Sequence, residues 1–549
     1  MSFQPRNWSD ADWPARTFGE LLRWSAETYG PDHLVYDFEA EDLQWTIAEV
    51  EERTALFARA LLANGIEIGD KVAVWCPGRS LWPLAEVASP RVGAVVCGLN
   101  TRYRLDELEH VLSTLEPRLI FVATGFLDID SVGLLREAIA SLGAEAPWAR
   151  SCELIVSPKV GDDGAFDERT LSAFLADGER VDATALDERG AKLSPSEPAI
   201  IQFTSGSTGN SKGVLISHDA AHRTAFNLTN TMGLGSADVM YSPLPFYHIG
   251  GTLCTALAAL VCGARMVIPE RFSAGAALQS IARVPCTAYQ GHAAMYTMLV
   301  EEQRAHPADI SALRKGWGSA PGAVLLRAHD ELGMTDIVQT YGMSETGLSS
   351  SNMPGDPLEK RTHSIGRPIP GSEVSLRDPE TEEEVEPGEV GEIWFKGATV
   401  MSGYLHDPEA TAATIRDGWL RSGDLAQFDE DGFLHFSGRF KEMIKPGGEN
   451  VSIAEVERFL VEDPRIREAA VVGVPDDRLG EVPVAVVQLA AGEELGEEEI
   501  IARCAGGIAN FKVPRRVWIV DHVPMMEMGK VDRRAVREFV TETLTTGAA

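Results

Sequence analysis

Hydrophobic positions in the first part of the chain alternate between helical and strand periodicity. Apolar residues recur every three or four positions over 46–62 and again over 105–115, which predicts two amphipathic helices. Thr46 and Glu49 have the spacing of a capping box at the start of the first helix. The apolar runs between and after them predict buried strands over 71–76, 93–99 and 119–123. This alternation predicts α/β layers around a mainly parallel sheet.

The remainder of the chain continues the alternation and then changes character. Strand-to-loop transitions recur through 263–345, and in a doubly wound sheet such carboxyl ends of strands carry ligand sites. The acidic, turn-rich segment 377–392 predicts a solvated hairpin loop without chemistry, next to a small β-barrel-like subdomain. The last part predicts a compact α+β module, with helices at 456–460 and 497–504 and strands at 469–474, 484–489 and 516–520.

Length and charge exclude several classes of protein. The 549 residues are too many for one core, and the formal net charge of −33 argues against a surface for nucleic acid or anionic lipid. The seven cysteines are scattered, which indicates reduced core residues. The segment 239–264 carries no charge, but its prolines and glycines favour buried interior over a membrane span. With a polar, acidic amino terminus, we expect a cytoplasmic protein without a membrane span.

Residues 200–218, IIQFTSGSTGNSKGVLISH, carry the first candidate chemistry. A short apolar strand opens into a loop of glycines and hydroxyl residues that ends at Lys212, and such a loop predicts a phosphate-binding site. It is not a Walker loop, because Ser211 and Gly213 stand where that motif needs Gly before the lysine and Ser or Thr after it. By composition alone, the segment is also compatible with an ordinary surface loop.

The order of residues in this loop resembles the phosphate-binding signature of the adenylate-forming enzymes, the superfamily of acyl-CoA synthetases, carrier-protein-loading adenylation domains and beetle luciferases. Further matches extend the resemblance over about residues 17–535. It implies that the following residues bind the phosphates of ATP: Thr204, Ser205, Gly206, Ser207, Thr208, Gly209 and Lys212.

Two further segments resemble nucleotide-binding motifs of the same family. The run YGMSETG implies roles in ATP and AMP binding for Tyr341, Gly342, Met343, Ser344 and Thr346, with Tyr341 near the adenine; the loop of Gly318, Ser319, Ala320 and Pro321 is expected to pack on the same base. Glu345 is expected to hold the Mg²⁺ that accompanies ATP, since Mg²⁺ prefers carboxylate and phosphate oxygens. Asp424, assisted by Arg439, is expected to bind the ribose hydroxyls.

The resemblance also implies a two-domain mechanism. An AMP-binding N-terminal domain of layered α/β subdomains plus a small β-barrel would occupy residues 1–438, and a small mobile α+β domain residues 439–549. Lys441 is expected at the hinge, and Lys445, Gly447 and Gly448 in the loop that admits CoA.

Lys530 stands at the place of the family's catalytic lysine and would neutralise the carboxylate and the α-phosphate. Met528 and Ser211 depart from the family's usual Thr and Pro beside the functional residues, without removing those residues.

Around His248 the resemblance implies an acyl pocket. Tyr247, His248, Gly291 and Trp317 are expected to line it, and the absence of an Asp at 246–248 argues against an amino-acid substrate. The expected activity is an ATP-dependent acyl-CoA ligase that activates a hydrophobic carboxylic acid and releases AMP and pyrophosphate. A ligase that loads a carrier protein and a catalytically silent nucleotide sensor remain alternatives. Chain length and ring content of the acid stay open, and a homodimer is the default expectation.

Overall fold

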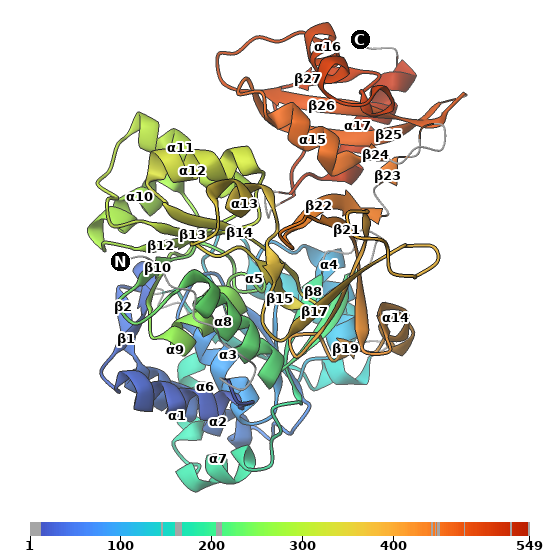
Figure 1. Ribbon diagram of the computed structural model, residues 1–549. Coiled ribbons are helices and arrows are strands. Elements are labelled where there is room, and N and C mark those ends of the chain that lie inside the picture. The colour runs from blue at the N-terminus through green and yellow to red at the C-terminus, as the bar shows by residue number, and fades with distance from the viewer. Residues whose placement is uncertain are drawn as a thin grey trace.

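The structure is a computed structural model that describes residues 13–143, 146–159, 167–204, 211–440, 443–444, 446, 451–476, 478–526 and 530–546. The molecule consists of two large sheets, a five-stranded sheet and a separate C-terminal lobe (Figure 1). Several predicted site residues lie outside the described residues: Ser205, Gly206, Ser207, Thr208, Gly209, Lys441, Lys445, Gly447 and Gly448. Met528 lies outside them as well.

The first large sheet has eight strands in the order β19-β9-β8-β4-β3-β5-β6-β7. Its inner strands pair in parallel, whereas β9 runs antiparallel to β8 and β19 runs antiparallel to β9. The strands are β3 (Lys71–Trp75), β4 (Val95–Gly98), β5 (Leu119–Ala123), β6 (Glu153–Ser157), β7 (Arg169–Thr170), β8 (Pro198–Thr204), β9 (Lys212–Ser217) and β19 (Gly403–Tyr404). The predicted parallel strands are confirmed, and the antiparallel pair β8–β9 brackets the candidate phosphate loop.

The second large sheet has nine strands in the order β16-β15-β14-β13-β12-β10-β11-β1-β2. Parallel pairing connects β14, β13, β12, β10, β11 and β1, and antiparallel strands close both edges. The strands are β1 (Leu34–Phe38), β2 (Leu43–Thr46), β10 (Val239–Tyr241), β11 (Arg265–Ile268), β12 (Ala288–Gln290), β13 (Lys315–Gly318), β14 (Asp336–Met343), β15 (Gly347–Ser351) and β16 (Arg367–Pro368). The carboxyl ends of β12, β13 and β14 therefore meet at one edge of this sheet.

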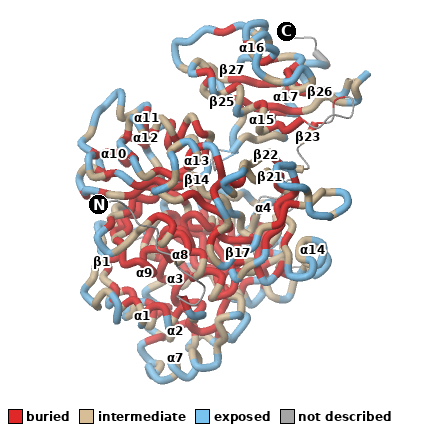
Figure 2. Tube along the Cα trace, viewed as in Figure 1, coloured by how far each residue is buried: buried red, intermediate tan, exposed pale blue. Residues whose placement is uncertain are grey.

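Helices fill the space between the sheets and cover their outer faces. Every residue of α3 (Leu81–Arg91) is buried, and α8 (His218–Met232) contacts β8 and β9 of one sheet and β15 of the other. Figure 2 shows this central layer as a continuous buried region. The π-helix η4 (Thr252–Leu257) and α9 (Ala258–Cys262) lie in the uncharged segment 239–264 and are buried, as predicted for protein interior. No helix in the described part of the chain is long and apolar enough to cross a membrane.

The remaining helices of these layers follow the sequence pattern. In α2 the Glu49 amide donates to the Thr46 hydroxyl, and the Glu49 carboxylate accepts from the Thr46 amide, so the predicted capping box is confirmed. The helices are α1 (Phe18–Tyr29), α2 (Ile47–Ala63), α4 (Leu105–Leu115), α5 (Ser131–Leu142), α6 (Leu171–Gly178), α7 (Ala183–Gly190), α10 (Ala274–Arg283), α11 (Ala293–Ala305), α12 (Gly322–Leu332), α13 (Leu358–His363) and α14 (Pro408–Thr414). Short 3-10 turns lie at η2 (Glu39–Glu41) and η3 (Pro147–Arg150).

A curved five-stranded sheet follows the two layered sheets. Its order is β17-β18-β21-β20, with β22 paired to the other side of β21. The strands are β17 (Ser372–Arg377), β18 (Gly391–Gly397), β20 (Ile415–Arg416), β21 (Trp419–Phe428) and β22 (Leu434–Arg439). The antiparallel pair β17–β18 confirms the predicted hairpin at 377–392.

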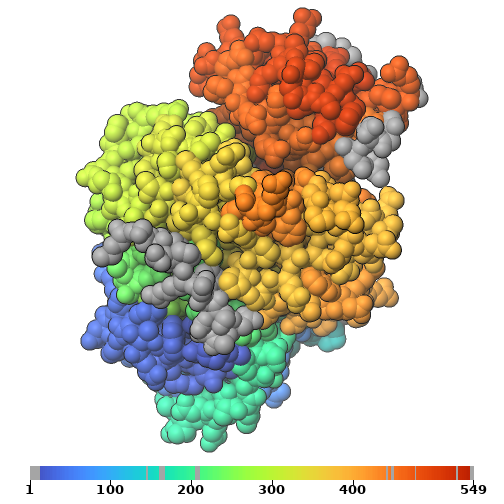
Figure 3. Space-filling view, in the orientation of Figure 1, coloured from blue at the N-terminus to red at the C-terminus, as the bar shows by residue number. Residues whose placement is uncertain are grey.

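The C-terminal lobe, defined here as the described residues from 443 onward, has its own hydrophobic clusters. It forms a separate mass above the rest of the molecule in Figures 1 and 3. Its elements are β23 (Met443–Ile444), β24 (Val451–Ser452), α15 (Ile453–Val461), β25 (Ile466–Asp476), β26 (Gly480–Leu489), α16 (Glu497–Gly507), η7 (Asn510–Lys512), β27 (Val517–Val520) and α17 (Arg533–Thr546). The predicted α+β module is confirmed, while the boundary at 438/439 stays a prediction.

Cysteine thiols are withdrawn from solvent throughout the molecule. Cys152 is half-buried, the other six are buried, and all seven are free. Burial raises the pKa of every thiol, to about 12 for Cys152, Cys254, Cys262 and Cys286. The prediction of reduced core cysteines is therefore confirmed.

Candidate active site

Residues far apart in the sequence meet where the phosphate loop ends. Lys212, the first residue of β9, places its ammonium 4.9 Å from the centre of the Tyr404 ring. The Tyr404 hydroxyl donates to Glu345 Oε1 at 3.0 Å, and the Glu345 carbonyl accepts from the Met401 amide at 2.8 Å. Pairing of β19 with β9 brings Tyr404 to this position. The predicted phosphate lysine and metal-binding carboxylate therefore share one aromatic neighbour, Tyr404, which the sequence motifs did not identify.

Glu345 has the environment expected of a carboxylate that meets a cation. Its side chain is 7% exposed, and burial raises the pKa of the carboxyl despite the hydrogen bond from Tyr404. A buried anion is costly unless a positive charge compensates it. Mg²⁺ commonly takes one or two protein carboxylates and completes its shell with phosphate oxygens and water. Glu345 therefore fits the predicted Mg²⁺ held together with ATP.

The residues next to Glu345 in the motif differ in how accessible they are to a ligand. Thr346 is 1% exposed, and its hydroxyl accepts from the Ser349 hydroxyl at 2.7 Å. Ser344 and Met343 are half-buried and Gly342 is exposed. Ser344 is therefore better placed than Thr346 to meet a ligand oxygen.

Asp424 receives hydrogen bonds from the two residues that the motifs associated with the nucleotide. The Tyr341 hydroxyl donates to Asp424 Oδ2 at 2.6 Å, and Arg439 Nε donates to Oδ1 at 3.0 Å. Antiparallel pairing of β21 with β22 sets Asp424 directly opposite Arg439. The same Asp424 and Arg439 charges act on Glu345, with opposite effects on its pKa. The predicted ribose carboxylate and metal carboxylate therefore belong to one site.

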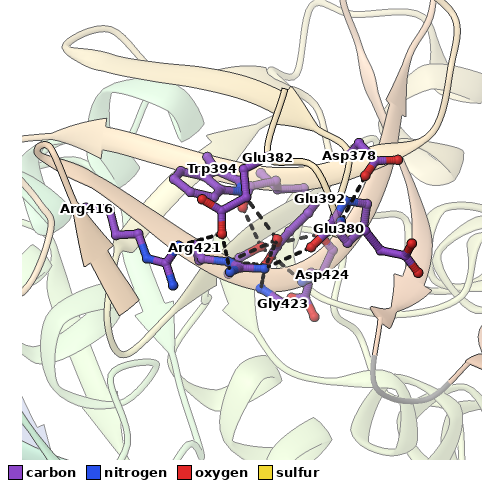
Figure 4. Close-up of polar contacts among 12 residues, drawn as sticks. Asp378, Glu380, Glu382, Glu392, Trp394, Arg416, Arg421, Gly423 and Asp424 are labelled. Atoms are coloured by element: carbon purple, nitrogen blue, oxygen red, sulfur yellow. Dashed lines mark hydrogen bonds and ion pairs between the residues drawn. The ribbon is translucent and has the colours of Figure 1, made fainter. Parts of the chain in front are cut away.

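Glu392 supports the backbone before Asp424. It is 2% exposed, and its Oε1 accepts from the Gly423 amide at 3.1 Å, while Oε2 accepts from Arg421 Nη2 at 2.8 Å. Figure 4 shows this network behind Asp424, with Glu382 and Arg416 extending it outward. The expectation of a solvated loop over 377–392 is wrong for Glu392, which is buried although it ends an acidic run; that the segment takes no part in the chemistry stays a prediction.

The candidate acyl pocket lies at the carboxyl ends of β12 and β13. The Gly291 amide donates to the Trp317 carbonyl at 3.3 Å, and a methyl group on Gly318 would lie 1.9 Å from the Gly291 carbonyl oxygen. With its amide oriented to satisfy both neighbours, Gln290 donates to the Gly250 carbonyl at 2.9 Å and accepts from Trp317 Nε1 at 3.2 Å. These contacts tie the loop of His248 to two of the predicted pocket residues.

The loop after β13 lies between the candidate acyl pocket and the residues predicted to bind the nucleotide. Ala320 is buried, Ser319 is exposed and Pro321 is half-buried before α12 begins. Gln339 of β14, with its amide oriented to satisfy its neighbours, donates to the Ala320 carbonyl at 3.0 Å. Register pairs Gly318 with Gln339, two residues before Tyr341. The predicted adenine loop and Tyr341 therefore lie on neighbouring strands.

The imidazoles of His248, in the candidate acyl pocket, and of His292 both feel a charge from the C-terminal lobe. Burial lowers the pKa of His248 to about 4, helped by the charge of Lys530 and by His292. Burial also lowers the pKa of His292 to about 4, and again the charge of Lys530 contributes. His292 precedes α11, and its Nδ1 is buried without a hydrogen-bond partner among the described residues. The charge of the predicted catalytic lysine therefore acts on His248 of the predicted acyl pocket and on His292, a second histidine that no motif indicated.

Packing explains the aromatic character of the pocket wall. Phe246, next to Tyr247, stacks on Trp82 of α3 with ring centres 5.8 Å apart. Gly98, at the end of β4, lies under both groups, since a methyl group there would be 2.6 Å from the Trp82 ring and 2.7 Å from the Tyr247 Cα. The wall is therefore built by residues from both large sheets.

Comparisons with known proteins decide the family. The model of the AMP-binding enzyme family matches residues 22–405, and that of the AMP-binding enzyme C-terminal domain matches residues 455–530. The chain belongs to the AMP-binding enzyme family. The predicted resemblance is thereby confirmed, and with it the fold class. The individual roles of the site residues remain predictions.

Relatives of this AMP-binding enzyme are acyl-CoA synthetases and ligases. A Mycobacterium tuberculosis protein, 3-[(3aS,4S,7aS)-7a-methyl-1,5-dioxo-octahydro-1H-inden-4-yl]propanoyl:CoA ligase, is 35% identical over 516 residues, which cover 93% of this chain and 96% of the relative. The mitochondrial medium-chain acyl-CoA ligase ACSF2 of Rattus norvegicus is 31% identical over 547 residues, 96% of this chain and 88% of the relative. Among solved structures, ATP-bound MatB from Rhodopseudomonas palustris is 28% identical, with a TM-score of 0.80 over 95% of this chain and 99% of that one. The protein is thus an AMP-forming ligase of the acyl-CoA synthetase class.

Proposed function

We propose that this enzyme converts a hydrophobic carboxylic acid, ATP and CoA into the acyl-CoA thioester, AMP and pyrophosphate. The observation that carries the proposal is the position of Lys530. Its charge reaches both His248 and His292 in the candidate acyl pocket. A lysine from the C-terminal lobe beside this pocket can neutralise a carboxylate as it approaches a phosphate.

In the first half-reaction the substrate carboxylate attacks the α-phosphorus of ATP, and the bond to pyrophosphate breaks. Lys530 neutralises the carboxylate and the α-phosphate, and Lys212 neutralises phosphate oxygens. Asp424 orients the ribose, and Tyr341 and Arg439 hold Asp424 in place. When bound, Mg²⁺ supplies charge neutralisation of the triphosphate at Glu345. Positioning and electrostatics account for this step, with no covalent enzyme intermediate.

In the second half-reaction the CoA thiol attacks the acyl carbon, the bond to AMP breaks, and the thiol proton leaves to solvent. We propose that the C-terminal domain, predicted to span residues 439–549 and containing the C-terminal lobe, turns about a hinge at Lys441 between the two steps. That rotation withdraws Lys530 and presents the loop of Lys445, Gly447 and Gly448 to CoA. Separate hydrophobic clusters in the C-terminal lobe support its movement as a unit.

The aromatic pocket wall supports a hydrophobic acid as the substrate. Phe246, Trp82 and Trp317 are buried apolar side chains, and Tyr247, next to Phe246, is half-buried. The names of the relatives point to a medium-chain fatty acid or to a propanoate that carries a fused ring system. We propose an acid of one of these two kinds, since Trp317 would limit the length of a straight chain.

The test is mass spectrometry of products after incubation with ATP, Mg²⁺, CoA and a panel of fatty, alicyclic and aryl acids. Formation of acyl-CoA with AMP and pyrophosphate is the expected result and names the acid. Accumulation of acyl-adenylate without thioester would favour loading of a carrier protein. Absence of any AMP across the panel would contradict the ligase and favour a nucleotide sensor.

A further inference from the structure

An ion pair connects the C-terminal lobe to α11 of the large lobe. Arg467, near the start of β25, places Nη2 3.0 Å from Oε2 of Glu301. The two side chains are 35% and 47% exposed, so the pair lies at the rim of the contact between the lobes. The residues are 166 positions apart, and the pair exists only while β25 faces α11.

Further charges surround the pair on both sides of this contact. Glu468 lies beside Arg467 and senses the charges of Arg467, of Arg327 on α12 and of Glu301. Residues of both lobes also enclose a small cavity of about 80 Å³, with Thr297, Val300 and Arg304 on one side and Pro464, Ile466 and Ala490 on the other. The contact is thus small, incompletely packed and charged, which suits a surface that forms and separates.

The opposite end of α11 lies in the candidate acyl pocket. The helix begins directly after His292, whose pKa is lowered by burial and by the charge of Lys530. Glu301 follows nine residues later, about 14 Å along the helix axis at 1.5 Å per residue. This helix therefore contacts the C-terminal lobe through Arg467, and His292 before its other end feels the charge of Lys530 from the same lobe.

We propose that Glu301 and Arg467 are positioning residues for the first half-reaction. The pair holds the C-terminal lobe in the orientation that places Lys530 beside His248 and His292, and it separates when the lobe turns for thioester formation. The inference rests on the proposed function. An exposed ion pair typically shifts an equilibrium between two conformations by about 1.5-fold to fivefold. This is enough to favour one orientation of the C-terminal lobe, and it is weak enough for the pair to break in every turnover.

The experiment separates the two half-reactions in variants of the full-length enzyme. Glu301→Arg and Arg467→Glu each replace the attraction with repulsion, and the double variant restores an ion pair with the charges exchanged. Adenylation is followed by exchange of pyrophosphate into ATP with the acid found for the wild type. Thioester formation is followed from supplied acyl-adenylate and CoA.

Each single variant should slow adenylation about three- to tenfold while thioester formation stays unchanged or becomes faster, and the double variant should recover to within about twofold. Glu499→Arg is the matched control, because it breaks a pair with Arg465 inside the C-terminal lobe and should leave both rates unchanged. Equal slowing of both half-reactions by the single variants, or no recovery in the double variant, would overturn the proposal.

A second measurement keeps this inference separate from the proposed function. If the wild type shows no exchange with any acid, the proposed function fails, and small-angle scattering of the same four proteins still tests the pair. Scattering of the single variants should report a changed arrangement of the lobes, and the double variant should return to the wild-type curve. Identical curves for all four proteins would overturn the positioning role.

Discussion

Lys530 brings a positive charge from the C-terminal lobe to two imidazoles that burial keeps neutral. Lys530→Ala should reduce adenylation by about 10²- to 10³-fold, because the approaching carboxylate and phosphate would repel each other without it. Thioester formation from supplied acyl-adenylate should persist, since the proposed rotation of the C-terminal lobe withdraws the lysine in that step. Stopped-flow assays of each half-reaction measure both effects. Lys396→Ala, on the exposed side of β18, is the control, and equal loss of both steps in Lys530→Ala would contradict the assigned role.

Tyr404 contacts both Lys212, the predicted phosphate lysine, and Glu345, the predicted metal carboxylate. Tyr404→Phe keeps the ring under Lys212 but removes the hydrogen bond to Glu345, and a hydrogen bond to a charged group contributes about 1.5–3 kcal/mol. We expect kcat/KM for MgATP to fall about 10- to 100-fold, as measured by steady-state kinetics. Tyr36→Phe removes a comparable buried hydrogen bond, to the Ala256 carbonyl, and should leave kcat/KM unchanged. An unchanged kcat/KM in Tyr404→Phe would contradict a role of this hydrogen bond in the reaction.

Glu86 is an acid that the proposed mechanism does not use. It is 2% exposed on α3, and burial raises the pKa of its carboxyl to about 8, above the ordinary 4.5. The folded state therefore holds a proton that the unfolded state loses, so wild-type stability falls as pH rises from about 4.5 to 8, by about 1.4 kcal/mol for each unit of pKa difference.

Glu86→Gln removes this linkage, and its stability advantage over the wild type should grow between pH 5.5 and pH 8. Urea unfolding at the two pH values measures the difference. The exposed substitution Glu52→Gln on α2 should give the same small difference at both. A pH-independent difference for Glu86→Gln would show that the carboxyl is not held neutral.

For helices and strands, local sequence patterns predicted the individual elements but not how distant elements contact one another. The capping box of Thr46 and Glu49 and the apolar spacing of α4 and β5 specify those elements within a few residues. No local pattern indicates that β19 pairs with β9 or that Gln290 reaches Gly250, because those contacts depend on tertiary packing. For the same reason the motifs identified Glu345 and Lys212 but not Tyr404, Glu392 or His292.

The loop after β12 and the end of β13 are packed so closely that a larger residue at Gly318 should disturb both. Gly318 has a φ of 157°, and an added methyl group would meet the Gly291 carbonyl oxygen at 1.9 Å. Gly318→Ala should therefore push the two loops apart, destabilise the large lobe by about 1–3 kcal/mol and weaken binding of the acid. Denaturant unfolding and KM for the acid test this. Gly190→Ala in α7, where a methyl group meets nothing within 4 Å, should change neither. Unaltered stability of Gly318→Ala would contradict the observed packing.

The whole molecule should lose stability in mild acid. Burial lowers the pKa of His218, His248 and His292 to about 4, and of His222 well below its ordinary 6.5. Each binds a proton more readily when unfolded, so the stability they contribute above pH 6.5 is lost as pH falls toward 4. The raised carboxyl pKa values of Glu86, Glu345 and Glu468 oppose this trend, with three carboxyls against four imidazoles.

Urea midpoints at pH 7.5 and pH 5.5 measure the loss of stability. All four histidines precede the C-terminal lobe in the chain. The urea midpoint of the part that contains them should therefore fall at pH 5.5, while the midpoint of the C-terminal lobe should not change. His222→Gln should reduce the movement, because a neutral amide has no proton to gain. Equal midpoints at the two pH values would contradict the neutral, buried state of these histidines.

Six buried cysteines and one half-buried cysteine, all with thiol pKa values raised by burial, make the chain well suited to fluorescence labelling. Maleimide dyes react with thiolates, and thiols whose pKa is raised by burial present almost none at neutral pH. A cysteine introduced on each lobe would therefore take up donor and acceptor dyes selectively, without removal of the native ones. Energy transfer between such dyes would show whether the C-terminal lobe makes the proposed rotation in single molecules during turnover.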